Sequence, residues 1–169
     1  MDIPKNIWFN PALAARRKAN ALTLEDNVLI SVAAAVAAVF PDCKVNVGNK
    51  TSGVKPPELG VSLYGQSNRQ MLADTNQYRF SVEITYIPAD SVDRAEINHA
   101  LFLLLSLDRM DSDIGTFRLR DKASDTTDSL GHITGNITVA EQSVPTDEEA
   151  PVIQEADQII RKAETEVIP

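Results

Sequence analysis

Nine consecutive residues, 78–86, alternate between large apolar and polar side chains, and no other stretch constrains the fold as strongly. A period of two places alternate side chains on opposite faces of a strand, so this strand has one buried and one solvated face. Pro88 ends it because proline has no N–H to donate to a sheet ladder. A helix capped by Asp90 or Ser91 follows and finishes in the apolar run 100–107. The segment 40–107 therefore specifies a fold and leaves little room for a catalytic centre.

A second helix is predicted from Thr23 to Phe40. Thr23 and Asp26 have the spacing of a capping box, and apolar residues recur at helical spacing from Leu24 onward. The opposite side of this helix is small and uncharged, so it packs closely on the other helix or on another surface. Short strands are predicted at 44–47, 59–64, 78–86, 116–122 and 130–140, joined by loops that include 65–77, 108–115 and 123–129. The prediction is an α+β fold with a four- to five-stranded, mostly antiparallel sheet and two helices packed on one face.

The chain divides into three predicted parts. Residues 1–22 form an N-terminal arm with a short basic helix that begins at Pro11, residues 23–144 form the domain, and residues 145–169 form an acidic amphipathic helix or arm. A helix as short as the last one is marginal alone in water and needs a surface. Each arm either docks on a partner molecule or folds back on its own domain.

Charge and composition exclude several classes of protein. The net charge is −8, with +3 over residues 1–20, −5 over residues 145–169, and −8 − 3 + 5 = −6 for the body between them. A body of this charge repels phosphate, so we expect no nucleic-acid binding. A single cysteine, Cys43, permits no disulfide within the chain and fits a reducing compartment. We expect no signal peptide and no membrane span, because no apolar run approaches about 20 residues.

Side chains that could carry chemistry are few. His99 has only Glu96 at metal-ligand spacing, and a solvated helix side explains both residues better. Asp108, Asp111 and Asp113 resemble part of a calcium loop but depart from its spacing, so an acidic loop is preferred. No nucleophile elbow and no phosphate-binding loop occurs. We predict no enzyme activity, no catalytic residue, no metal site and no cofactor.

Exposed apolar residues indicate contact with other molecules instead. The helix end at 100–107 has too few polar residues for a solvent side, so either the helix from Thr23 or a neighbouring subunit covers it. The apolar pair Met71-Leu72 interrupts the polar loop at 65–77 and either tucks back into the core or forms an exposed contact patch. An aromatic cluster also stands in the N-terminal arm, and isoleucines line one side of the acidic arm. The candidate interface residues are Trp8, Phe9, Met71, Leu72, Leu101, Phe102, Leu105, Ile153 and Ile160.

Several of these segments together resemble the tail terminator (tail completion) proteins of phages of low-GC Gram-positive bacteria. The resemblance covers about residues 23–143 and rests on 40–45, on Lys55-Pro56-Pro57 leading into 59–61, and on the strand 78–88 followed by a helix and two strands. The first 22 residues are longer, and the last strand less aromatic, than in that family. The resemblance implies a virion protein, made in the host cytoplasm, that forms a hexameric ring on the head-proximal end of a tail tube. It implies partners too: other copies of the chain, the tube protein, a sheath protein if the tail contracts, and head-tail connector proteins, with DNA passing through unbound.

Two other interpretations compete with this one. The chain could be a head-to-tail stopper, neck or other tail-assembly protein, which shares the structural role. It could also be a small cytoplasmic binding module that uses the polar sheet face and the glycine-containing loop near 48–53 to hold a peptide or ligand. Neighbouring genes for tube, sheath or tape-measure proteins would favour the assembly role over the binding module.

Overall fold

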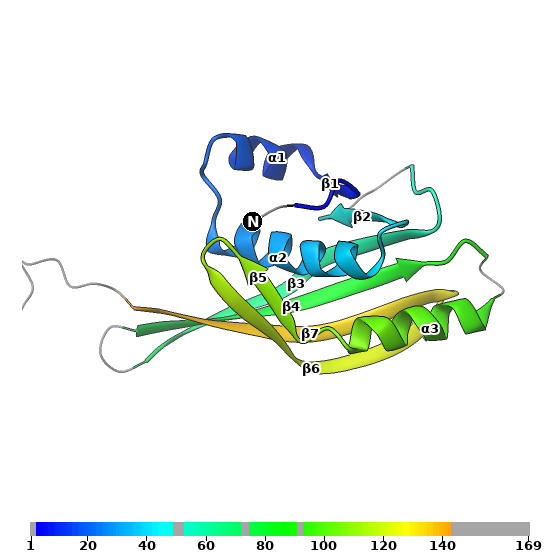
Figure 1. The fold of residues 1–169 in the computed structure, drawn as a ribbon. Helices are drawn as coiled ribbons and strands as arrows, with labels where there is room; N and C mark the ends of the chain where they lie inside the picture. The colour runs from blue at the N-terminus through cyan, green and yellow to red at the C-terminus, as the bar shows by residue number, and fades with distance from the viewer. Residues whose placement is uncertain (1–2, 49–52, 72–74, 91–92, 143–169) are drawn as a thin grey trace, which may run out of the picture.

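A computed structural model describes residues 3–48, 53–71, 75–90 and 93–142 (Figure 1). In chain order the elements are β1 Ile7–Phe9, α1 Pro11–Lys18, α2 Leu24–Val39, β2 Lys44–Val47, β3 Glu58–Gln70, β4 Thr75–Ile87, α3 Arg94–Leu105, β5 Arg109–Ser112, β6 Gly115–Thr127 and β7 Leu130–Gln142. The predicted α+β class is confirmed.

The strands form one curled, mixed sheet in the order β1-β2-β3-β4-β7-β6-β5. β2 lies parallel to both β1 and β3, and the other neighbouring strands within the described residues are antiparallel. The pairings of β3 with β4 and of β4 with β7 are long. In the pairing of β4 with β7, Thr75 is opposite Gln142 and Tyr86 is opposite Gly131. The centre of the sheet is thus a three-stranded antiparallel unit.

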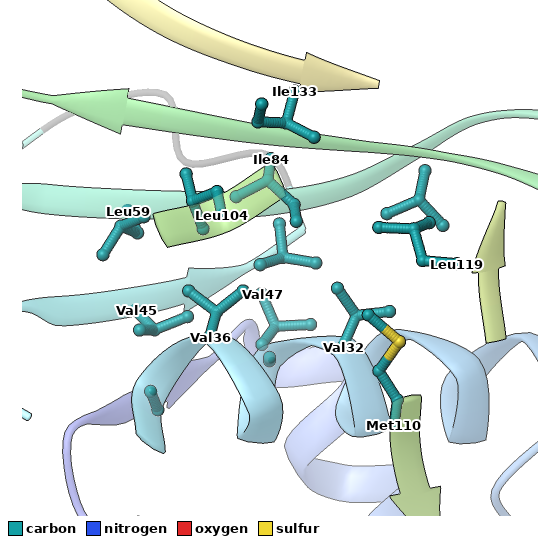
Figure 2. Close-up of a cluster of buried hydrophobic side chains, with 14 of the residues drawn as sticks. Val32, Val36, Val45, Val47, Leu59, Ile84, Leu104, Met110, Leu119 and Ile133 are labelled. Atoms are coloured by element: carbon teal, nitrogen blue, oxygen red, sulfur yellow. The ribbon is translucent and has the colours of Figure 1, made fainter. Parts of the chain in front are cut away.

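Helices α2 and α3 pack on the same face of this sheet. α2 contacts β2 and β3 near one edge and β5 at the other, whereas α3 contacts β4, β6 and β7. The sheet must curl for one helix to reach both edges. One core results, to which α2, α3 and the strands β2–β7 all contribute side chains (Figure 2). The labelled members are Val32, Val36, Val45, Val47, Leu59, Ile84, Leu104, Met110, Leu119 and Ile133.

Local sequence explains where the helices begin. The Asn10 side chain accepts from Leu13 N at the start of α1, with Pro11 at the first helical position. Thr23 and Asp26 form the predicted capping box of α2. The cap of α3 is Asp93, which accepts from Ala95 N and Glu96 N. The prediction of Asp90 or Ser91 as the cap was wrong. Asp93 is the last side chain able to accept a hydrogen bond before the apolar positions of the helix begin, so it caps the helix.

The predicted number of strands was wrong, since seven strands replace four to five over the residues that the structure describes. Of the three helices in that part, α2 and α3 are the two predicted on one face, and α1 is the short basic helix predicted in the N-terminal arm. Residues 65–70 continue β3 and residues 123–127 continue β6, where the sequence predicted loops. These extensions are polar on both faces, so they have no alternation to reveal them. The predicted acidic loop at 108–115 contains β5 and its turn into β6.

The N-terminal segment packs on its own domain in this structure, which was one of the two alternatives. β1 pairs with β2, and the Asn6 side chain donates to Phe40 O and Cys43 O at 3.0 and 2.8 Å. Leu13 of α1 is only 1% exposed, within the same core as α2. The domain boundaries at 22 and 144 stay predictions.

Two glycines of β7 allow close packing. A Cβ at Gly135 would lie 2.7 Å from Leu119 Cδ1, and one at Gly131 would lie 3.0 Å from Leu101 Cδ2. β6 bulges opposite Gly135, between Arg120 and Ala123. The bulge lets Lys122 donate to Leu105 O and Leu107 O at the C-terminus of α3, where a cation offsets the unpaired carbonyls.

Candidate interaction surfaces

One face of the sheet carries both core helices, and the opposite face, called here the open face, carries polar side chains. Along β4 the residues that point into the core are buried from Phe80 to Tyr86, and those between them are partly exposed. On the open face His132 Nδ1 lies 3.1 Å from Glu83 Oε1 and 3.4 Å from Thr85 Oγ1. Polar groups of neighbouring strands thus partner one another, as the wet face of a one-sided sheet requires.

Arginines gather at one end of the open face. A hollow of about 420 Å³, called here the arginine hollow, is lined by Arg109, Thr116, Arg118, Arg120 and Thr138. The alternation of Arg118 and Arg120 with buried Phe117 and Leu119 places both arginines on the open face. The apolar residues of this alternation predicted the strand, and the arginines between them carried no signal of a cluster.

A smaller hollow of about 180 Å³ lies where β2, β3 and β4 meet the open face. Its lining includes buried Asn46 and Glu58, together with Glu83 and Thr85. Lys44 Nζ lies 3.9 Å from Glu58 Oε1. Asn46 donates to Leu59 O, but its Oδ1 is buried without a hydrogen-bond partner. This part of the open face therefore presents acceptor oxygens.

The hairpin of β3 and β4 extends past α2 and α3, together with the end of β7 (Figure 1). Residues 66–71 are exposed, and Met71 N donates to Thr75 O near the tip. Met71 is 42% exposed and Tyr64 is 60% exposed. Met71 does not tuck into the core, and Leu72 lies outside the described residues.

Helix α3 separates the three predicted interface residues of its apolar end. Phe102 is 70% exposed, Leu101 is only 7% exposed and contacts the core, and Leu105 is partly buried. The helix has a solvent side after all, and Phe102 stands on it beside exposed Asn98 and His99. Helix α2 packs mainly on the sheet rather than over α3, so it leaves this side free.

The aromatic cluster near the N-terminus is partly covered by basic side chains. Arg17 lies over the Phe9 ring at 5.3 Å from its centroid, and Lys44 lies over the Trp8 ring at 5.8 Å. Trp8 remains 37% exposed. Phe9 packs against the core from a partly buried position. The candidates Ile153 and Ile160 lie outside the described residues.

Two pairs of ionisable side chains, Arg16 with Asp26 and Tyr86 with Glu96, have structural roles away from these surfaces. The Arg16 guanidinium donates twice to Asp26 at 2.7 Å and lowers the pKa of that buried carboxyl, and backbone donation from Thr23 adds to the effect. Burial, with the hydrogen bond to Glu96, raises the pKa of Tyr86. Glu96 also accepts from Ala89 N, so it ties β4 to α3. Burial raises the pKa of Cys43.

The described residues hold no group of three or more His, Cys, Asp or Glu side chains placed to bind a metal ion. None of the helices in the described part has the length and apolar character needed to cross a bilayer. What the geometry offers is surface: an open polar face, a projecting hairpin, and the exposed Phe102.

The chain matches a known protein family. A family model described as phage tail terminator protein matches residues 27–149, which is well over half of the chain. It covers α2 from Asn27 onward, α3 and every strand from β2 to β7. A comparison with curated proteins gave no match.

Proposed function

The chain belongs to a phage tail terminator family and is thus a component of the virion tail, and from this premise we propose that six copies close into a ring on the head-proximal end of the tail tube. The ring stops tube polymerisation and provides the surface on which the head connector docks. Its partners are further copies of the chain, the tube protein, connector proteins, and a sheath protein in a contractile tail. The family match is the observation that carries this proposal.

The exposed surfaces supply what a ring needs. A head-to-tail ring uses two different patches of each subunit, and closure satisfies both in every copy. The projecting hairpin with Met71 and the outer side of α3 with Phe102 are two such patches. They also differ in kind, one being a β-ribbon and the other a helix side. An isolated phenylalanine with this much exposure on a helix is a natural anchor for a neighbour.

The role we propose is structural, without a catalytic step or cofactor. DNA passes through the ring without being held, because the body between the two terminal segments carries a net charge of −8 − 3 + 5 = −6. A duplex-binding assay of the full chain at physiological salt should therefore show no complex. Tight binding with a steep salt dependence would count against both the ring and its passive lumen.

The direct test is assembly on tubes made from the tube protein of the same phage. We expect the wild-type chain to form rings at tube ends, seen by electron microscopy, and to stop tube growth. Light scattering of the purified chain measures its oligomeric state in solution. A chain that stays monomeric at high concentration and also in the presence of tubes would overturn the proposal, whereas a neck or stopper protein would bind the connector and leave tube length unchanged.

Phe102→Asp sharpens this test. A charge at the exposed position should abolish ring formation and leave the fold intact, since the side chain contributes little to the core. Asn98→Asp, on the same exposed side of α3, is the matched control for added charge. If Phe102→Asp assembles like the wild type while circular dichroism shows a folded chain, the outer side of α3 is not a subunit contact.

A further inference from the structure

The arginine hollow concentrates positive charge at one end of the open face. Its lining consists of three arginines and two threonines, with no carboxylate among the lining residues. Arg109 and Arg118 are directly opposite in the β5–β6 register, and Arg120 follows two residues along β6. The arginines thus stand side by side on neighbouring strands, all exposed to solvent.

Their present partners neutralise them only in part. Arg109 pairs with Asp111 at 3.2 Å, and Arg118 pairs with Asp108 at 3.5 Å, both between exposed side chains. Exposed pairs of this kind contribute little and exchange readily for other carboxylates. The Arg120 side chain has neither a hydrogen bond nor an ion pair with any residue in the described part of the chain. The hollow therefore has capacity for further anionic groups.

We propose that the acidic C-terminal segment of the same chain, residues 143–169, binds in the arginine hollow. The segment contains seven acidic and two basic residues, so its charge is 2 − 7 = −5. Three of the acids, Asp147, Glu148 and Glu149, are consecutive. Arginine pairs with carboxylates through its planar fork of donors, so this triplet is the part that the hollow would hold.

Chain geometry permits the contact. β7 ends at Gln142, four residues after Thr138, which lines the hollow. At about 3.3 Å per residue, Gln142 lies roughly 13 Å along the strand from Thr138. The five residues from Gln142 to Asp147 span up to about 17 Å when extended. The acidic triplet can therefore fold back to the level of the hollow. The proposal holds whether or not the chain forms a ring.

Nucleic-acid phosphate is the rival occupant of an arginine cluster. The net charge of −8 opposes it, because a duplex approaching the hollow meets the field of the whole acidic chain. The acidic segment is also tethered beside the hollow, which gives it a high effective concentration that no free ligand has. The observations thus favour the protein's own segment.

The experiment is NMR spectroscopy of the full 15N-labelled chain at about 20 mM and about 500 mM salt, between which the Debye length falls from roughly 20 Å to roughly 4 Å. We expect the amide signals of residues 147–149 to shift between the two conditions in the wild type. In the variant Arg118→Glu/Arg120→Glu, the amide signals of residues 147–149 at low salt should already resemble those of the wild type at high salt. Adding Glu148→Arg/Glu149→Arg to that variant should restore most of the salt-dependent shift.

The matched control is Lys55→Glu/Arg69→Glu, which makes the same change in net charge at two exposed positions outside the hollow. It should leave the wild-type behaviour of residues 147–149 unchanged. Three results would overturn the proposal: salt-insensitive signals in the wild type, shifts that vanish on dilution and so come from another copy, or duplex DNA binding that Arg118→Glu/Arg120→Glu abolishes.

Discussion

Neighbouring residues of β4 show how differently the two faces of the sheet are used. Ile84 points into the core, is 1% exposed, and lies among side chains of the other central strands and α3 (Figure 2). Thr85, the next residue, lies on the open face and meets His132 across the strand. The first residue contributes to folding through burial, and the second contributes a polar group to an accessible surface.

The open face is stable without a cover because its polar groups partner one another across strands. Glu83 meets His132, and Ser81 donates to Asn136 at 3.1 Å. A face of this kind can stay wet or can meet a polar partner. The covered face offers no such choice, because its apolar side chains require α2 and α3. The comparison predicts that substitutions should separate into large stability effects on one face and small ones on the other.

The largest effect should come from Ile84→Ala. Removing a fully buried side chain from the centre of the core should lower the free energy of unfolding by about 2–5 kcal/mol. Urea denaturation monitored by circular dichroism measures the loss. Thr85→Ala, the control on the open face, should change that free energy by less than about 1 kcal/mol. Equal losses for the two variants would contradict the difference between the faces.

Asp26→Asn, in the first turn of α2, should have the next largest effect. The amide keeps the shape, but it removes the charge and replaces one of the two oxygens that accept hydrogen bonds from Arg16 with a donor nitrogen. We therefore expect the free energy of unfolding to fall by about 1–3 kcal/mol at neutral pH. The folded protein lowers the pKa of Asp26, so its contribution is present above the unfolded pKa of about 3.9 and is lost as the pH falls through the folded value.

Urea denaturation of both proteins at about pH 7 and about pH 3 tests the sign of this effect. The difference between wild type and Asp26→Asn should shrink at the lower pH, because below the unfolded pKa of about 3.9 the unfolded wild type takes up a proton that the folded carboxyl resists. A difference that stays constant over this range would mean that hydrogen-bond geometry rather than charge accounts for the effect.

The sequence predicted the covered face far better than the ends of the strands. Alternation was sufficient to predict β4, and the capping box was sufficient to predict the start of α2. In both elements the local sequence pattern agrees with the burial of the side chains. The outer parts of β3 and β6 are exposed on both sides, so their strand structure depends on ladder pairing with β4 and β7. β5 falls within a predicted loop because Met110 is its only buried residue. No local pattern marks such segments.

The candidate surfaces were predicted in part. Phe102 was selected with Leu101 because the run 100–107 is apolar all round, and only packing on β7 decides which of the two is buried. The cluster of Arg109, Arg118 and Arg120 could not be found from spacing alone. It needs the β5–β6 register, and the predicted loop at 108–115 removed one of its strands.

Lys122→Met should have a moderate effect and tests the bulge in β6. The bulge takes this side chain away from the open face, so that its ammonium donates to Leu105 O at 2.7 Å and Leu107 O at 2.6 Å. Methionine keeps the stem but leaves both carbonyls without a donor, which should cost about 1–2 kcal/mol in urea denaturation. Lys55→Met, at an exposed loop position, should cost nothing measurable. Similar behaviour of the two variants would show that water replaces the ammonium at the end of α3.

The smallest effect should belong to the pair of Glu83 and His132 on the open face. Both side chains are partly exposed, so a double-mutant cycle of Glu83→Gln and His132→Gln should give a coupling free energy below about 1 kcal/mol. The measurement is urea denaturation of the wild type, both single variants and the double variant at one pH. A coupling of several kcal/mol would mean that pairs on the open face contribute as much to stability as burial on the covered face. A small coupling, with Ile84→Ala strongly destabilising, would leave the open face free for contacts because stability does not depend on it.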